Sequence, residues 1–220
     1  MENKTLDIVI AGLGSQPLAY ACFVLARMAQ NKGLDVQILE PEGTPCKALA
    51  HVRIGRKATR NLIAEGEADV LLGLEPVDAL KAVRYLKKGG LAVINGPDDL
   101  SNERLAPAFP DVENPLSLLE GYQVERRDTL TLSREMGAPV AVVTILLGML
   151  SKHLPFSQFD WKHAIGSSVP RKTFAVNINA FLVGRGEAEA DYDDENDAPK
   201  RSLLDQSETK KDDECSETIM

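Results

Sequence analysis

The chain has 220 residues, of which 44% are hydrophobic and 26% are charged, and its formal net charge is -8. This length and composition suffice for one domain with a complete hydrophobic core. The acidity is confined to the end, because residues from Arg185 onward hold 13 acidic and 5 basic side chains, whereas the preceding part holds 20 of each. A neutral body in which only 5% of residues are aromatic argues against nucleic acid as a partner.

Membrane insertion, secretion and metal binding are also not expected. The sequence lacks an uninterrupted apolar run of about 18 residues, so it predicts no transmembrane helix. Residues 1–4 lack the basic-then-apolar layout of a signal peptide, which favours a cytoplasmic protein. The cysteines at 22, 46 and 215 are too far apart for a cluster or zinc spacing, and the three histidines do not gather with acids. Cys22 is expected in the core, and Cys46 is either a reactive or an inert loop thiol.

The chain begins with the most informative pattern. A strand at 7–11 is followed by the turn GLGSQP at 12–17, an amphipathic helix that ends at Gly33, and a second strand at 36–39 that ends at Glu40. This order predicts the opening βαβ unit of a doubly wound fold.

The turn resembles a dinucleotide fingerprint but departs from it. Pro17 stands where the third glycine of G-x-G-x-x-G would lie, and a proline ring adds bulk and removes an N–H donor. Glu40 lies at about the sequence distance from which an acid can bind a ribose hydroxyl. Two interpretations follow: a dinucleotide site, or a glycine turn needed only for the passage from strand to helix.

The middle of the chain predicts an open α/β sheet. A strand at 51–54 forms an edge hairpin, and the apolar run at 68–74 is typical of a strand buried on both faces of a parallel sheet. A helix is predicted from Val77 to about Lys87, ended by Lys87, Lys88 and Gly89, and another strand at 91–95. We therefore expect a Rossmann-like, mainly parallel sheet with helices on both faces.

The last part of the folded region is predicted to be mostly helical. Residues 97–115 read as an irregular connection or a short helix, and 123–127 as a further strand. Helices are expected at 129–136, 139–152, 159–165 and 170–182. Residues 1–184 would form one domain, and 185–220 a disordered acidic tail, because few large apolar side chains remain there to offset the entropy of ordering.

Taken together, these segments resemble the gamma subunits or domains of the 2-oxoacid:ferredoxin oxidoreductases, most closely the small subunit of the indolepyruvate type. The matching stretches are IVIAGLG at 8–14 followed by Gln16, HVRIG at 51–55, GEADVLLGLEP at 66–76, YLKKGG at 85–90, and VPRK at 169–172 with Asn177, Ala180 and Phe181. They cover most of the region between Leu6 and Gly184.

The resemblance implies a function within a larger enzyme. In that family, thiamine diphosphate attacks a 2-oxoacid, carbon dioxide leaves, clusters carry electrons to ferredoxin and coenzyme A takes the acyl group. The resemblance places thiamine diphosphate and iron–sulfur clusters on a large partner subunit, with coenzyme A at the interface, and leaves this chain without a cofactor of its own. The implied substrate is an aryl or branched 2-oxoacid, and the isolated chain would be inactive.

Two loops depart from the family pattern. The usual Gly-Gly-Gln-Gly turn reads GSQP at 14–17, and the loop that usually carries Arg-Gly-Gly is shortened to GTPCKALA at 43–50. Both loops are expected at the carboxyl ends of strands. This is the edge of an open α/β sheet where the ligand crevice lies. The expected cofactor-binding residues are Gly12, Gly14, Ser15, Gln16 and Arg53.

Arg53 begins a basic run that continues with Arg56, Lys57 and Arg60, which would bind coenzyme A phosphates or an acidic face of the partner, or would form a solvated loop. Two rival functions remain at this point. One is a nucleotide-binding module or small dehydrogenase that uses Gly12, Gly14 and Glu40, and the other is a non-catalytic scaffold of the same complex.

Overall fold

The computed structural model describes residues 5–12, 14–41, 46, 48–58, 61–97, 99–138 and 141–187. Most of the tail expected at 185–220 therefore lies outside the described residues, as do Arg60 and half of the shortened loop, residues 43–45 and 47. Among the helices within these ranges, none is long and apolar enough to cross a bilayer.

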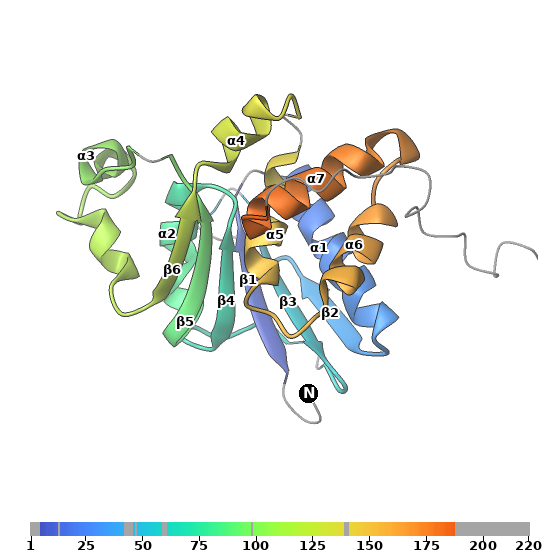
Figure 1. Cartoon of the computed structure of the whole chain (residues 1–220). Coiled ribbons are helices and arrows are strands. Elements are labelled where there is room, and N and C mark those ends of the chain that lie inside the picture. Colours follow the sequence, from blue (N-terminus) through green and yellow to red (C-terminus); the bar gives the residue numbers. More distant parts are fainter. Residues whose placement is uncertain are drawn as a thin grey trace, which may run out of the picture.

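A six-stranded sheet with the order β2-β3-β1-β4-β5-β6 forms the centre of the fold (Figure 1). Its strands are β1 (Leu6–Ala11), β2 (Asp35–Leu39), β3 (Leu49–Gly55), β4 (Ala68–Gly73), β5 (Leu86–Asn95) and β6 (Gln123–Arg127). The neighbours β1, β4, β5 and β6 run parallel, whereas β3 is antiparallel to both β1 and β2. The predicted α/β class and mainly parallel sheet are confirmed.

Helices cover both faces of this sheet. They are α1 (Ser15–Asn31), α2 (Pro76–Ala82), α3 (Asn102–Leu105), α4 (Thr129–Glu135), α5 (Val142–Ser151), α6 (Gln158–Gly166) and α7 (Phe174–Arg185), with single 3₁₀ turns at Val83–Tyr85, Ala106–Ala108, Pro115–Leu119 and Arg171–Thr173. Figure 1 shows α1, α5, α6 and α7 on one side of the sheet and α2 on the other. The apolar strand residues alternate between these two layers, as the period of two requires.

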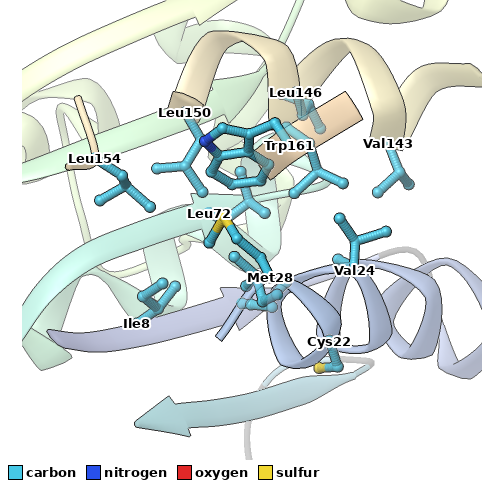
Figure 2. Packing of buried hydrophobic residues seen from close by; sticks show 14 of the residues in the cluster. Ile8, Cys22, Val24, Met28, Leu72, Val143, Leu146, Leu150, Leu154 and Trp161 are labelled. Atoms are coloured by element: carbon cyan, nitrogen blue, oxygen red, sulfur yellow. The ribbon is translucent and has the colours of Figure 1, made fainter. Parts of the chain in front are cut away.

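The thicker layer holds the main core. Trp161 of α6 is fully buried and stacks on Phe181 of α7, with ring centroids 6.2 Å apart. Figure 2 shows this indole among Leu146 and Leu150 of α5, above Met28 of α1. α5 is buried along its whole length, which explains why its sequence is apolar almost all round.

The opening βαβ unit differs from the prediction in one respect. β2 runs parallel to β1, as expected, but β3 lies between them and pairs with both. The burial of the two strands gives the reason: β3 is buried along most of its length, whereas β2 is only half-buried and forms the edge. The strand that follows β2 in sequence therefore occupies the inner place, between β1 and β2.

The helix predicted at 77–87 was too long. α2 ends at Ala82, one 3₁₀ turn follows, and β5 already begins at Leu86. Residues 87–90 form an irregular part of β5, where the register with β4 shifts, and Lys87 forms an ion pair with Asp69 of β4. Pairing with the neighbouring strand has overridden the helical periodicity that the local sequence suggests.

Candidate functional site at the carboxyl edge of the sheet

Four parallel strands end at one edge of the sheet, which we call the carboxyl edge. The residues that follow them are Gly12 after β1, Leu74 after β4, Gly96 after β5 and Asp128 after β6. Open α/β sheets bind ligands outside the carboxyl ends of their strands. The predicted glycine turn therefore lies where the fold class places a site.

Gly12 is required by the geometry of this edge. Its φ is 104°, and a Cβ atom there would lie 2.9 Å from the backbone N of Glu75. Its N–H donates to the carbonyl of Ala48 over 2.9 Å, which ties the turn to the segment that enters β3. The Gly12 N–H is thus already used within the chain, and any ligand must be bound by the residues that follow.

Those residues form the start of α1. Gly14 is the N-cap residue with φ of 75°, and no side chain of the described residues caps this end of the helix. Gln16 is exposed in the first turn, and the first turn holds no acidic residue. The free N–H groups and the positive end of the helix dipole of a 17-residue helix favour an anion at this place.

A hollow of about 490 Å³ lies beside the turn, between α2 and α4. It is lined by Glu75, Pro76, Val77, Asp78, Lys81, Asn95, Pro97, Asp128, Leu130, Thr131 and Arg134. Lys81 and Arg134 supply cations from opposite helices, and the carboxylates come from both walls. Backbone hydrogen bonding by Thr131 lowers the pKa of Asp128, which caps α4 and is ionised.

Sequence reasoning missed two features of this hollow. Asn95 forms part of its lining and connects the two walls, and Leu130 of α4 is 40% exposed at its rim. The one available signal was a polar residue at the end of the apolar run 91–94. Such a residue at the carboxyl end of a buried parallel strand faces the ligand edge.

The structure does not bring Arg53 to this site. Arg53 pairs with Asp7 in the register of β3 and β1, near the amino end of β1 and therefore at the opposite edge of the sheet. Its Nε and Nη2 atoms donate to the two carboxylate oxygens of Asp7 over 2.7 and 3.0 Å, and this hydrogen bonding raises the pKa of the guanidinium. The predicted site residues Gly12, Gly14, Ser15 and Gln16 are contiguous, and Arg53 stands apart from them.

A line of charges continues from Arg53 across the amino edge. Asp69 accepts a hydrogen bond from the backbone N of Asp7 over 2.9 Å and forms an ion pair with Lys87. Four neighbouring strands thus contribute Arg53, Asp7, Asp69 and Lys87, with basic residues at the two ends. We call these four residues the charge ladder. Arg56 and Lys57 follow it as exposed turn residues.

The structure also bears on the roles considered for Glu40 and Cys46. Glu40 is exposed at the end of β2, which β3 separates from β1, so it does not lie beside the glycine turn in the way a dinucleotide site requires. Burial, together with Asp78, raises the pKa of the Cys46 thiol to about 11. The Cys46 thiol donates to the carbonyl of Asp78 over 3.5 Å, and this environment favours the inert interpretation.

His51 is a buried polar residue of β3. Its Nδ1 accepts from the backbone N of Ile63 over 2.9 Å, and its ring meets Tyr85 edge-on with centroids 5.0 Å apart. Burial, with Arg53 nearby, lowers the pKa of His51, so the imidazole is neutral. No group of His, Cys, Asp and Glu side chains within the described ranges could hold a metal ion.

Comparison with known proteins agrees with this fold. Residues 7–187 match the family model described as pyruvate ferredoxin/flavodoxin oxidoreductase. The indolepyruvate oxidoreductase subunit IorB of Thermococcus kodakarensis is 34% identical in an alignment of 192 positions that covers 82% of this chain and 95% of that protein. The subunit of the same name from Pyrococcus horikoshii is 33% identical over the same shares of both chains.

Solved structures share the fold. The gamma subunit of a keto/oxoacid ferredoxin oxidoreductase from Geobacter sulfurreducens matches 81% of this chain and 95% of its own, with a TM-score of 0.60 and 22% identity. The 2-oxoglutarate:ferredoxin oxidoreductase of Magnetococcus marinus, solved with 2-oxoglutarate, coenzyme A and succinyl-CoA, matches 84% of this chain with a TM-score of 0.61 and 22% identity. The match covers 31% of that longer chain.

Proposed function

The chain belongs to the pyruvate ferredoxin/flavodoxin oxidoreductase family, and we propose that it is the gamma-type subunit of an indolepyruvate-type member. Its place as a subunit of a 2-oxoacid:ferredoxin oxidoreductase complex follows from the family and the IorB relatives. The observation that carries the indolepyruvate type is the 34% identity that extends over 95% of an IorB subunit.

In this proposal the cytoplasmic complex oxidises and decarboxylates an aryl or branched 2-oxoacid, forms an acyl-CoA and reduces ferredoxin. Thiamine diphosphate and iron–sulfur clusters on the large partner subunit supply the decarboxylation and the one-electron transfer. This chain contributes the carboxyl edge of its sheet.

The glycine turn provides the binding element. The start of α1 presents N–H groups that no described side chain caps, and the amide of exposed Gln16 stands in the same turn. We assign Gly14, Ser15 and Gln16, shaped by Gly12, to a phosphate of coenzyme A at the interface with the partner. Coenzyme A is named as a ligand of the Magnetococcus relative, which supports this choice.

Reconstitution tests the proposal. The full chain is purified alone and together with the thiamine- and cluster-containing subunit, and reduction of a dye is measured with arylpyruvates and branched 2-oxoacids in the presence of coenzyme A. We expect dye reduction only by the complex. Activity of the chain alone would refute the subunit role, and a complex that forms without turnover would favour the non-catalytic scaffold.

The dinucleotide alternative is tested by calorimetric titration of the full chain with NAD and NADP. The position of Glu40 beyond β3 and the presence of Pro17 in the turn predict no binding of either coenzyme. Micromolar affinity for one of them would restore the nucleotide-binding module.

A further inference from the structure

Asn95 connects the two walls of the hollow at the carboxyl edge. It ends β5, and its side-chain Nδ2 donates to the carbonyl of Leu74 over 3.2 Å. Its Oδ1 accepts two hydrogen bonds from Thr129, one from the backbone N over 3.1 Å and one from the hydroxyl over 2.8 Å. One amide therefore spans the loops that follow β4 and β6.

The two groups that Asn95 holds are the beginnings of the wall helices. Leu74 precedes Glu75, the N-cap of α2, and Thr129 is the first residue of α4. Leu74 also donates its N–H to the carbonyl of Ala11 over 2.8 Å, next to Gly12. The connection thus runs from the glycine turn through Leu74 and Asn95 to α4.

The chemistry of this connection requires an amide. Leu74 presents a carbonyl that needs a donor, and Thr129 presents two donors that need an acceptor. Asparagine supplies both, whereas an ionised carboxylate only accepts and leucine does neither. Thr129 is fully buried at the start of α4, where its N–H has no partner within the helix, so it depends on this acceptor.

We propose that Asn95 is a positioning residue that sets the spacing of α2 and α4 and thereby the shape of the hollow, and that this hollow receives the part of coenzyme A that extends beyond the phosphate at the glycine turn. This inference rests on the proposed function for the identity of the ligand. It goes beyond that function because it makes the affinity for coenzyme A depend on Asn95, a residue outside the glycine turn.

The test compares Asn95→Asp with Asn95→Leu in the reconstituted complex. Near pH 8 both variants lose the donor to Leu74, and we expect KM for coenzyme A to rise about tenfold, equivalent to about 1.4 kcal/mol for an unsatisfied carbonyl. KM for the 2-oxoacid should stay within about twofold. Asn95→Asp keeps an acceptor for Thr129 and Asn95→Leu keeps none, so KM for coenzyme A should rise further in Asn95→Leu than in Asn95→Asp.

A milder variant keeps the test informative if the Asn95 variants fail to fold. Thr129→Val keeps the backbone N–H and removes only the hydroxyl donor, so KM for coenzyme A should rise about threefold. The inference is overturned if Asn95→Leu leaves KM for coenzyme A unchanged, or if it raises the KM values of both substrates equally. It is also overturned if Asn95→Asp leaves KM for coenzyme A unchanged.

Deuterium exchange of the full chain separates this inference from the proposed function. A wild-type complex without turnover would refute the function alone. In that case, faster exchange at the starts of α2 and α4 in Asn95→Leu than in the wild type would still support the positioning role, and unchanged exchange would overturn it.

Discussion

The two edges of the sheet carry different kinds of polar residue. At the amino edge, Arg53, Asp7, Asp69 and Lys87 form ion pairs and hydrogen bonds across four strands, and Asp69 and Lys87 also line a hollow of about 470 Å³. At the carboxyl edge, a hollow of about 490 Å³ lies near the glycine turn and a helix start that no described side chain caps. The two edges therefore differ in how far their polar groups are already paired within the chain, and not in the presence of a hollow.

The contrast explains why charge alone was a poor guide to the site. Arg53 has the residue type that phosphates prefer, but its guanidinium already binds a carboxylate in bidentate geometry. The turn at 12–16 contains no charged residue, yet the proposed function places the anion at its backbone N–H groups.

The largest effect on stability is expected at the charge ladder. Asp7→Ala removes the carboxylate beside Arg53, whose side chain is 12% exposed, and should lower the free energy of unfolding by about 3–5 kcal/mol. Urea unfolding measures this loss. The double variant Asp7→Leu with Arg53→Met replaces the pair with apolar side chains and should recover most of it. If the double variant is no more stable than Asp7→Ala, the loss in Asp7→Ala does not come from leaving Arg53 without its carboxylate.

The next largest loss of stability is expected at the glycine turn, and it should differ between Gly12 and Gly14. Gly12→Ala combines a positive φ with a Cβ atom 2.9 Å from the N of Glu75, and should cost about 2–3 kcal/mol. Gly14→Ala also meets a backbone conformation that is essentially limited to glycine, but no atom lies within 4 Å of the new Cβ, and it should cost about 1–2 kcal/mol. Thermal unfolding compares the two. Equal losses would show that contact with Glu75 does not restrict Gly12.

A smaller effect, which depends on pH, comes from His51 between the two edges. Because burial lowers its pKa below 6.5, the unfolded chain takes up a proton in a range where the folded chain does not. Stability is therefore complete above about pH 6.5 and falls below it, by at most about 1.4 kcal/mol per pH unit.

The matched control for this effect is His51→Asn, which offers an acceptor to Ile63 but does not titrate. Urea unfolding at several pH values should give a flatter dependence on pH for the variant between about pH 6.5 and pH 5. Identical slopes would assign the acid sensitivity to other groups.

The smallest effect on stability is expected for Gln16→Ala, because the side chain is exposed. Its free energy of unfolding should stay within about 0.5 kcal/mol of the wild type. In the complex, however, KM for coenzyme A should rise about tenfold through loss of a hydrogen bond to a charged phosphate. Arg56→Ala, an exposed residue beyond β3 at the opposite edge, serves as the control and should leave KM unchanged. Similar KM values for the two variants would remove Gln16 from the site.

The sequence predicted the strands well because their apolar runs are long and bounded by glycines and prolines, as at 68–74. It did not place β3 between β1 and β2, because neighbours in a sheet depend on burial that emerges only in the packed molecule. The strand start at Leu86 was missed for a related reason. A lysine such as Lys87 is typical of a helix end, and its ion pair with Asp69 of β4 exists only in the folded sheet.

The site was predicted in part. The turn could be located from its glycines, because positive φ and close backbone approach demand that residue type. Asn95 and Arg53 could not be assigned, because the partners that decide their roles, Thr129 and Asp7, are distant in sequence.

Deuterium exchange of the full chain, free and in complex with its large partner and coenzyme A, tests most directly whether the carboxyl edge is the binding edge and the amino edge is not. We predict new protection at the carboxyl edge, in segments 14–16, 96–97 and 128–131, and unchanged exchange at 56–58 and 88–90 on the amino edge. Protection confined to the amino-edge segments would contradict this account.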